Sequence, residues 1–279
     1  MSNHRKIYDN ILDAWLYTLG DHFYFGYFED DGLLLPEAVK KMYRHLATLA
    51  GITTATSVLN VGWGIGELEF FLHENYGCNI HRVYHDLARI ARARQRCIEK
   101  GYNRTVHFDT AHSLIGHFPA DHFDVILAFE SSVFFSDKNS FLADCWRMLR
   151  GGGRMVFADT MLVRELTLAD LFYDNQREML TLERTWGRMK MEALDAYRKK
   201  MEENRFRDVV ARDISPLVKP TLAKWKETAS AHRQQLLEVL DGGKLDDFSA
   251  SCDIMDSFFK DRVYCYGILT GVKGINERQ

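Results

Sequence analysis

Short apolar runs alternate with longer amphipathic segments through the middle of the chain. The short runs are rich in β-branched and aromatic residues, whereas the longer segments repeat their apolar positions at helical spacing. Strands are predicted at 57–61, 80–84, 105–109, 123–129 and 154–158, and helices at 67–76, 87–100 and 138–150. Strands that alternate with helices and short turns indicate a parallel, doubly wound α/β sheet.

Helical patterns also lie on either side of this central part. Apolar residues from Ile7 to Leu16 follow helical spacing, and Pro36 opens a second predicted helix through Leu49. The charged segment 162–206 is predicted to be helical and to form either a cap over the site or an oligomer contact. The remainder is predicted to hold a strand near 209–214, a helix at 220–240 and a last strand near 262–272.

Charge and cysteine content exclude several classes of protein. The 36 basic and 39 acidic residues are mixed along the chain and give a net charge of -3, so we expect no nucleic-acid partner. The five cysteines are widely spaced without a Cys-x-x-Cys pair, and the histidines lie on different elements; we therefore expect reduced thiols, a cytoplasmic protein and no metal site. No apolar run reaches about 18 residues, so neither a membrane span nor a signal peptide is expected.

A glycine-rich turn is the first candidate for chemistry. Gly62, Gly64 and Gly66 lie between a predicted strand and a predicted helix, where backbone amides can approach a ligand closely. The same spacing also occurs where a turn simply packs tightly. The turn alone is therefore a weak signal of function.

Three motifs in order resemble those of the class I S-adenosylmethionine (SAM)-dependent methyltransferases. They are Val-Leu-Asn-Val-Gly-Trp-Gly-Ile-Gly at 58–66, Phe-Asp-Val-Ile-Leu-Ala-Phe-Glu-Ser at 123–131, and Trp-Arg-Met-Leu-Arg-Gly-Gly-Gly-Arg at 146–154 followed by Asp159. The resemblance covers roughly residues 45–162. In addition, His-Phe-Tyr-Phe-Gly-Tyr-Phe at 22–28 looks like the N-terminal signature of the branch that modifies natural products, sarcosine-like amines or quinone precursors.

The resemblance implies a single methyltransferase domain with a Rossmann-like, mainly parallel seven-stranded sheet, N-terminal helices and a helical cap insert. Its expected parts are a helical preface at 1–50, a SAM-binding core at 51–161, the cap insert at 162–206 and the C-terminal part of the sheet at 207–279. The implied cofactor is SAM, bound at the carboxyl ends of the first four strands with the glycine loop under its methionine part.

Several cofactor contacts of the family are altered in this chain. Asn60 stands where the family usually has Asp, Tyr84 and His85 where an acid grips the ribose, and His112 where an acid meets the adenine amine. Asp86 lies two residues beyond the ribose position, and a short slip would restore a bidentate acceptor. Asn60 keeps an acceptor oxygen but loses the charge that favours an ammonium group.

Trp63 is a further departure, because the family normally has a small residue between these two glycines. Its indole must either point into the core or fill cofactor space. The candidate cofactor-binding residues are Asn60, Gly62, Trp63, Gly64, Gly66, His85, Asp86, His112 and Glu130.

Methyl transfer needs in-line positioning and a deprotonated nucleophile, and it requires no metal. The candidate catalytic residues are His22, Tyr24, Glu130 and Asp159. His22 and Tyr24 have an alternative interpretation as aromatic packing, and Asp159 as a cap of the following helix. Glu130 is the strongest candidate, because an acid directly after an apolar strand at the ligand-binding edge has little structural role.

The predicted function is SAM-dependent methyl transfer to oxygen, nitrogen or carbon of a small, partly apolar acceptor. The alternative is a protein that keeps the fold without methyl transfer, either a cyclase or isomerase or a catalytically silent partner subunit. The motivating observation is the joint change at Asn60, Trp63, Tyr84 and His112. A homo-oligomer formed through the cap is the expected assembly, if there is one.

Overall fold

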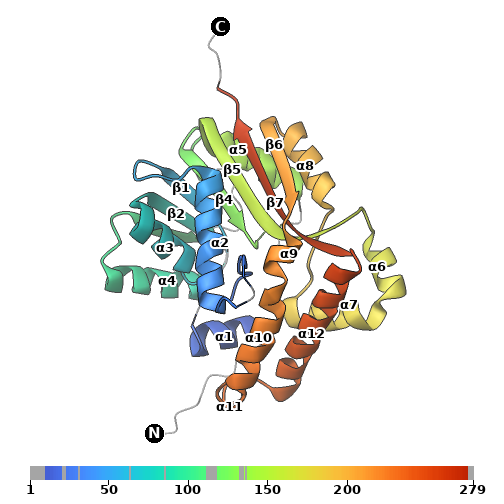
Figure 1. Cartoon of the computed structure of the whole chain (residues 1–279). Coiled ribbons are helices and arrows are strands. Elements are labelled where there is room, and N and C mark those ends of the chain that lie inside the picture. The colour runs from blue at the N-terminus through green and yellow to red at the C-terminus, as the bar shows by residue number, and fades with distance from the viewer. Residues whose placement is uncertain are drawn as a thin grey trace.

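A mainly parallel sheet lies at the centre of the computed structural model (Figure 1). The structure describes residues 10–20, 23–30, 32–62, 64–84, 86–110, 118–131, 135 and 137–275. Within them, the seven strands are β1 (Ser57–Val61), β2 (Asn79–Tyr84), β3 (Val106–Thr110), β4 (Phe123–Phe129), β5 (Leu149–Leu162), β6 (Phe206–Asp213) and β7 (Tyr264–Lys273). Their order is β3-β2-β1-β4-β5-β7-β6, and β7 runs antiparallel to both of its neighbours. The predicted Rossmann-like, mainly parallel seven-stranded sheet is confirmed.

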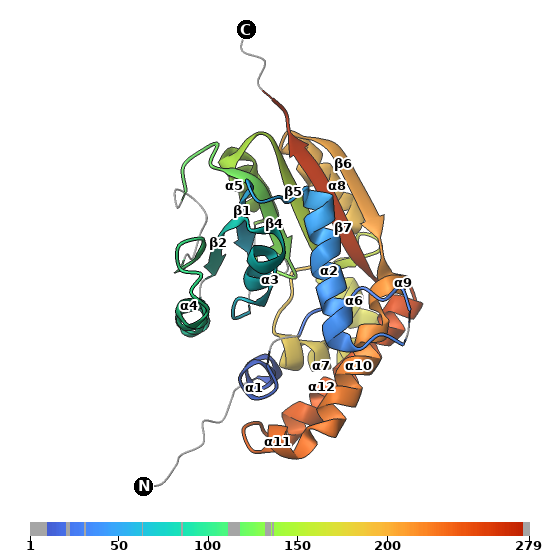
Figure 2. The same ribbon diagram turned by 60° about the vertical axis from the view of Figure 1, so that its left-hand side comes forward.

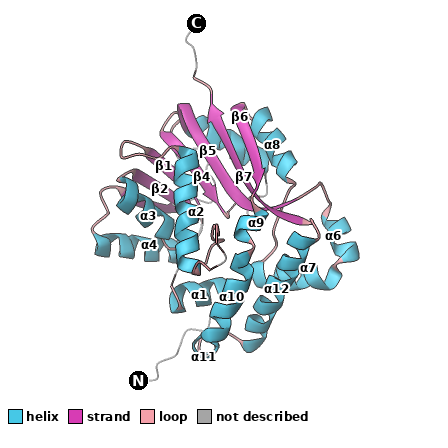
Figure 3. Ribbon diagram, viewed as in Figure 1, coloured by secondary structure: helices cyan, strands magenta, loops and turns pink. Residues whose placement is uncertain are grey.

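Helices cover both faces of this sheet, as Figure 3 shows. They include α2 (Leu35–Ala50), α3 (Glu67–Tyr76) and α4 (Leu87–Lys100), and, on the opposite face, α5 (Lys138–Met148) and α8 (Leu194–Glu203). Alternate residues of β4 supply the two cores: Val125 and Leu127 join the cluster that contains α2, whereas Ile126 and Ala128 join the cluster that contains α5 and α8. This alternation explains why β4 is an unbroken apolar run, since both of its faces are buried.

A second group of helices lies across the carboxyl ends of the parallel strands, at the bottom of Figures 1 and 2. It contains α1 (Ile11–Thr18), α6 (Leu168–Asp174), α7 (Gln176–Trp186), α9 (Ser215–Val218), α10 (Pro220–Ala231), α11 (Arg233–Leu237) and α12 (Gly242–Lys260). Helix α12 contacts α1, α7, α10 and α11, so segments far apart in sequence form one helical layer. Within the described part of the chain, no helix is long and apolar enough to cross a membrane.

Strand β5 is longer than the sequence pattern predicts. The helix expected at 138–150 ends at Met148, and the strand continues from Leu149 through the three glycines to Leu162. At the end of the strand, β7 pairs with β5 as far as Leu162. At its start, Leu149 pairs with Phe123 of β4, and the register then shifts so that pairing resumes at Arg154 after the three glycines. The length of β5 places Asp159 inside a strand rather than at the start of a helix.

Candidate functional site

The glycine loop connects β1 to α3 at the carboxyl edge of the sheet. Gly64 and Gly66 have φ values of 102° and 107°, a region that L side chains rarely adopt. A Cβ atom at Gly64 would collide with the hydroxyl of Tyr24, and one at Gly66 would lie 2.7 Å from Cε2 of Phe70. Glycine is therefore required at both positions by backbone conformation and by space. Trp63 lies outside the described residues.

Replacing Gly64 with Ala is expected to lower the free energy of unfolding by more than about 1 kcal/mol, because the new Cβ atom meets both the positive φ and Tyr24. Gly62→Ala is the matched control, since its Cβ atom would lie 3.4 Å from Nδ2 of Asn60, an ordinary contact. That control is expected to change the free energy by no more than about 1 kcal/mol. Urea denaturation measures both, and equal losses would contradict the assigned role of Gly64.

A buried ionic network supports the loop from below. Arg82 of β2 is fully buried and donates from Nε and Nη2 to the carbonyl of Gly62, at 3.1 and 3.0 Å, and from Nη2 to that of Gly64 at 2.9 Å. Its Nε lies 3.7 Å from a carboxylate oxygen of Glu69, which in turn accepts a 2.6 Å hydrogen bond from Nδ2 of Asn60. Sequence reasoning missed Arg82, although a charged residue at a buried strand position is a signal in itself.

The two polar atoms of the Asn60 amide therefore differ in their hydrogen bonding. Its Nδ2 holds Glu69, whereas its buried Oδ1 has no hydrogen-bond partner among the described residues. The amide lies beside Gly62, directly at the loop. A buried acceptor without a donor is costly, so this oxygen is suited to a donor supplied by a ligand.

Asp86 follows β2 and caps the next helix. Its Oδ1 accepts from the backbone N–H of Arg89 at 3.0 Å, and its Oδ2 lies 3.5 Å from Nε of Arg89. The Arg89 side chain also pairs with Asp13 of α1 at 2.8 Å, which ties the N-terminal segment to this edge of the sheet. His85 and His112, the other residues predicted at the nucleoside end, lie outside the described residues.

Glu130 follows β4 and is held by contacts from three directions. Its N–H donates to the carbonyl of Ala158 at 2.8 Å, while its Oε1 accepts from the N–H of Phe25 and from the hydroxyl of Tyr266, both at 2.9 Å. Its φ of 48° is unusual for a residue other than glycine, and such strain often marks a functional position. Burial, helped by the nearby Asp159 and opposed by the hydrogen bonds from Phe25 and Tyr266, raises the pKa of Glu130 to about 8. The carboxyl group can therefore exchange a proton near neutral pH.

The other two predicted catalytic residues within the described chain lie close to this group. Asp159 is buried in β5 and accepts the N–H of Thr160 at 2.8 Å, so it is not a helix cap. Tyr24 is buried, stacks on Phe129 at 4.9 Å and places its hydroxyl against Gly64. It combines aromatic packing with contact to the loop. His22 lies outside the described residues.

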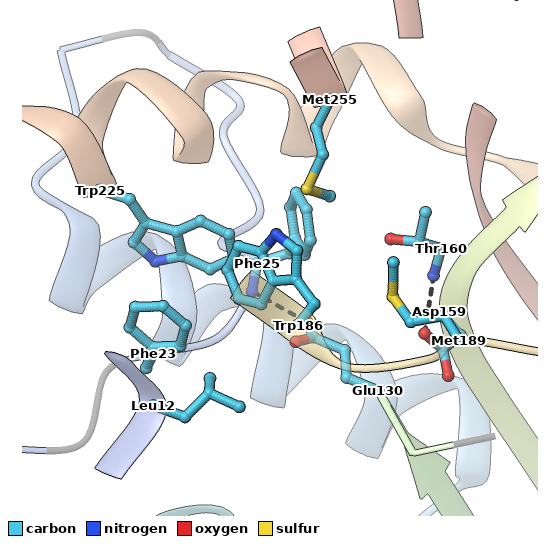
Figure 4. Close-up of a pocket in the computed structure, with 10 residues that line it drawn as sticks. All are labelled: Leu12, Phe23, Phe25, Glu130, Asp159, Thr160, Trp186, Met189, Trp225 and Met255. Carbon is cyan, nitrogen blue, oxygen red and sulfur yellow. Dashed lines mark hydrogen bonds between the residues drawn. The ribbon is translucent and has the colours of Figure 1, made fainter. Parts of the chain in front are cut away.

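A cavity of about 70 Å³ opens beside Glu130 and Asp159 (Figure 4). Apart from these two acids and Thr160, its wall is apolar and comes from the N-terminal segment, the predicted cap and the C-terminal helices. These wall residues are Leu12, Phe23, Phe25, Trp186, Met189, Trp225 and Met255. The sequence analysis did not assign these side chains to a site, because their local patterns are those of ordinary core residues.

The cavity and the glycine loop are neighbours at one edge of the sheet. Val61, the last residue of β1, pairs with Ala128 of β4. The hydroxyl of Ser131 donates to the carbonyl of Val61 at 2.6 Å and so joins the two strand ends. Tyr24, which contacts the loop, lies between two residues of the cavity wall, Phe23 and Phe25. The structure therefore brings the predicted loop residues and the two predicted acids into one region.

Comparison with known proteins gives a consistent picture. Residues 59–157 match the methyltransferase domain family. The 27-O-demethylrifamycin SV methyltransferase of Amycolatopsis mediterranei is 25% identical over 241 residues, which cover 86% of this chain and 87% of that protein.

Two solved structures share the fold over almost the whole chain. The mycolic acid cyclopropane synthase CmaA1, complexed with SAH and CTAB, has a TM-score of 0.82 at 16% identity and covers 94% of each chain. The [4+2]-cyclase SpnF has a TM-score of 0.78 at 18% identity and covers 96% of this chain and 95% of its own. The fold is thus found in proteins that catalyse more than one reaction.

Proposed function

Because this chain belongs to the class I SAM-dependent methyltransferases, we propose that it methylates an oxygen, nitrogen or carbon atom of a small, partly apolar molecule. The observation that carries the proposal is the cavity at the carboxyl ends of β4 and β5, beside the glycine loop. It joins an enclosed apolar wall to two carboxyl groups, which is the usual composition of a small-molecule site.

The residues around the loop fit the methionine end of SAM. The glycine loop lies beside the Asn60 amide, and the buried Oδ1 of Asn60 can accept a hydrogen bond from the cofactor. When bound, SAM supplies an electrophilic methyl group attached to a sulfonium. Asp86 is the proposed ribose contact, with Trp63, His85 and His112 as the other proposed contacts.

In this proposal the chain's own groups position the acceptor and handle its proton. Glu130 takes a proton from the acceptor or orients it, Asp159 holds a neighbouring polar group, and Tyr24 fixes the loop against the cavity. His22 remains a proposed catalytic residue. The apolar wall excludes water, which strengthens each electrostatic contact inside the cavity.

One observation favours the alternative of a methyltransferase fold that performs other chemistry. Asn60 lacks the charge that would attract the ammonium group of SAM. The cyclase SpnF has this same fold. The missing charge reduces the attraction for a cationic cofactor without closing the loop.

Calorimetric titration with SAM and with S-adenosylhomocysteine separates the two candidates. Micromolar binding of both ligands is expected if the chain is a methyltransferase, whereas no binding at millimolar ligand would rule out methyl transfer. Asp86→Asn is the informative variant, because Asn caps a helix as well as Asp but carries no charge. A weaker SAM complex with unchanged thermal stability would support Asp86 as the ribose contact, and unchanged affinity would remove it.

A further inference from the structure

Glu69 is a buried acid to which the proposed function gives no role. It is the third residue of α3, just after the glycine loop, and it is 1% exposed. A charged group buried so deeply needs polar partners. Its Oε1 accepts from Nδ2 of Asn60 at 2.6 Å and lies 3.7 Å from Nε of Arg82. The short hydrogen bond of this carboxylate is therefore made to the amide and not to the guanidinium.

The hydrogen bonds of Arg82 go to the glycine loop instead. Its Nε and Nη2 donate to the carbonyl of Gly62, and its Nη2 also donates to that of Gly64. A separation of 3.7 Å from Glu69 is too long for a hydrogen bond, although it is short enough for the two charges to attract each other. Arg82 thus balances the charge of Glu69 and leaves its Oε1 to Asn60.

The contact with Glu69 fixes which way the Asn60 amide faces. A carboxylate accepts hydrogen bonds and cannot donate one, so the amide must present its NH2 group to Glu69. If the amide turned over, its oxygen would lie against the carboxylate oxygen, and both atoms carry negative charge. A hydrogen bond to a charged acceptor is also stronger than one between neutral groups. Glu69 therefore favours a single orientation of the amide.

This orientation directs Oδ1 away from Glu69 and leaves it for a ligand. Asn60 is 3% exposed, and its Oδ1 has no donor among the described residues. The oxygen lies at the glycine loop, 3.5 Å from where a Cβ atom of Gly62 would be. Because a buried acceptor without a donor is costly, a ligand that donates at the loop removes that cost when it binds.

We infer that Glu69 is a positioning residue that sets the specificity of the glycine-loop site. By holding Nδ2 of Asn60, it presents Oδ1 to the protonated amino group of the ligand. The inference deepens the proposed function and rests on it for the identity of the ligand, whose methionine end carries that amino group. Glu69 acts through Asn60, so its effect depends on the residue at position 60.

The same contact makes asparagine the residue that this position requires. In Asn60→Asp an oxygen replaces Nδ2 and faces Oε1 of Glu69 across 2.6 Å. Two buried carboxylates at that distance repel each other, so one of them must take up a proton or the two must move apart. Introducing the acid that the family usually has here is therefore expected to weaken ligand binding in this chain.

Two ligands that differ in one group test the inference by calorimetry. They are S-adenosylhomocysteine and its deamino analogue, in which hydrogen replaces the amino group. The wild type is expected to bind S-adenosylhomocysteine at least fivefold more tightly, because only this ligand donates to Oδ1 of Asn60. Asn60→Asp is expected to weaken S-adenosylhomocysteine at least threefold and to change the affinity for the analogue less.

A second substitution is expected to reverse this loss. In the double variant Asn60→Asp with Glu69→Gln, the glutamine NH2 group can donate to the new carboxylate, whose other oxygen then faces the ligand. The double variant is expected to bind S-adenosylhomocysteine at least threefold more tightly than Asn60→Asp alone. Wild-type affinity in Asn60→Asp, or no recovery in the double variant, would overturn the inference.

Asn79→Asp is the matched control, because it makes the same change at an exposed position at the start of β2. An equal loss in this control would assign the effect to net charge and overturn the inference. Equal losses of both ligands in Asn60→Asp would assign it to a disturbed loop and have the same consequence.

Urea denaturation separates this outcome from that of the proposed function. Asn60→Asp is expected to lower the urea midpoint in the presence of Glu69 and to lower it less beside Glu69→Gln. Such coupling without any binding of SAM or S-adenosylhomocysteine would rule out methyl transfer but support the fixed orientation of Asn60. Micromolar SAM binding without coupling between the two positions would keep methyl transfer and overturn the role of Glu69.

Discussion

Arg82→Met is expected to lower the free energy of unfolding by about 3–5 kcal/mol, because it leaves the carboxylate of Glu69 buried without its cation. It also removes three hydrogen bonds to the carbonyls of Gly62 and Gly64. Methionine keeps much of the length of the arginine stem, so the loss reports the guanidinium rather than a cavity. Urea denaturation followed by circular dichroism measures it.

The double variant Arg82→Met with Glu69→Gln serves as the control. Removing both charges eliminates the unpaired carboxylate, so the double variant is expected to be more stable than Arg82→Met alone. If Arg82→Met were as stable as the wild type, the ionic network would have no structural role beneath the loop. Where the single variant folds, its affinity for SAM is expected to fall, since the loop carbonyls lose their support.

Glu130→Gln is expected to lower kcat/KM at least tenfold with any acceptor that the wild type methylates. Glutamine keeps the shape and can still accept from Phe25 and Tyr266, but it cannot take a proton. A base is active when deprotonated, so the wild-type rate is expected to rise with pH through about 8 and then level off. The rising limb is expected to be absent from the variant.

Tyr266→Phe tests the same assignment without touching the carboxyl group. The hydroxyl of Tyr266 lowers the pKa of Glu130, so its removal is expected to move the rising limb to higher pH. The rate at high pH is expected to recover toward that of the wild type. Rates that are unchanged in Glu130→Gln would remove Glu130 from the catalytic group, wherever the limb lies.

Local patterns predicted the central strands and helices well. They failed where packing between distant segments decides whether a helix forms or where a strand ends. Helix α12 was not predicted, although Asp241 caps it and its buried residues Leu245, Phe248 and Cys252 follow helical spacing. Its two initial glycines and many polar residues weaken the local signal, and the helix is stabilised by contact with α7 and α10. Likewise, antiparallel pairing with β7 extends β5 to Leu162, beyond the strand predicted at 154–158.

In the site, too, local sequence predicted some residues, and others depend on contacts between distant segments. Glu130 and Asp159 could be predicted because parallel strands end at one edge of a sheet. The cavity wall could not, since Phe23, Trp186 and Met255 come from three distant segments and each looks like an ordinary core residue in its own segment. Which apolar residues face a ligand is decided only when these segments meet.

The antiparallel position of β7 makes the site dependent on the order of synthesis. Strand β6 is made earlier but pairs with β7, so it can join the sheet only after Tyr264–Lys273 has left the ribosome. Strand β7 also carries Tyr266, whose hydroxyl donates to Glu130, a residue that lies 136 positions earlier in the chain. The nascent chain can therefore build β1 to β5 first, but the carboxyl group of Glu130 reaches its final hydrogen bonding only after Tyr266 has been translated.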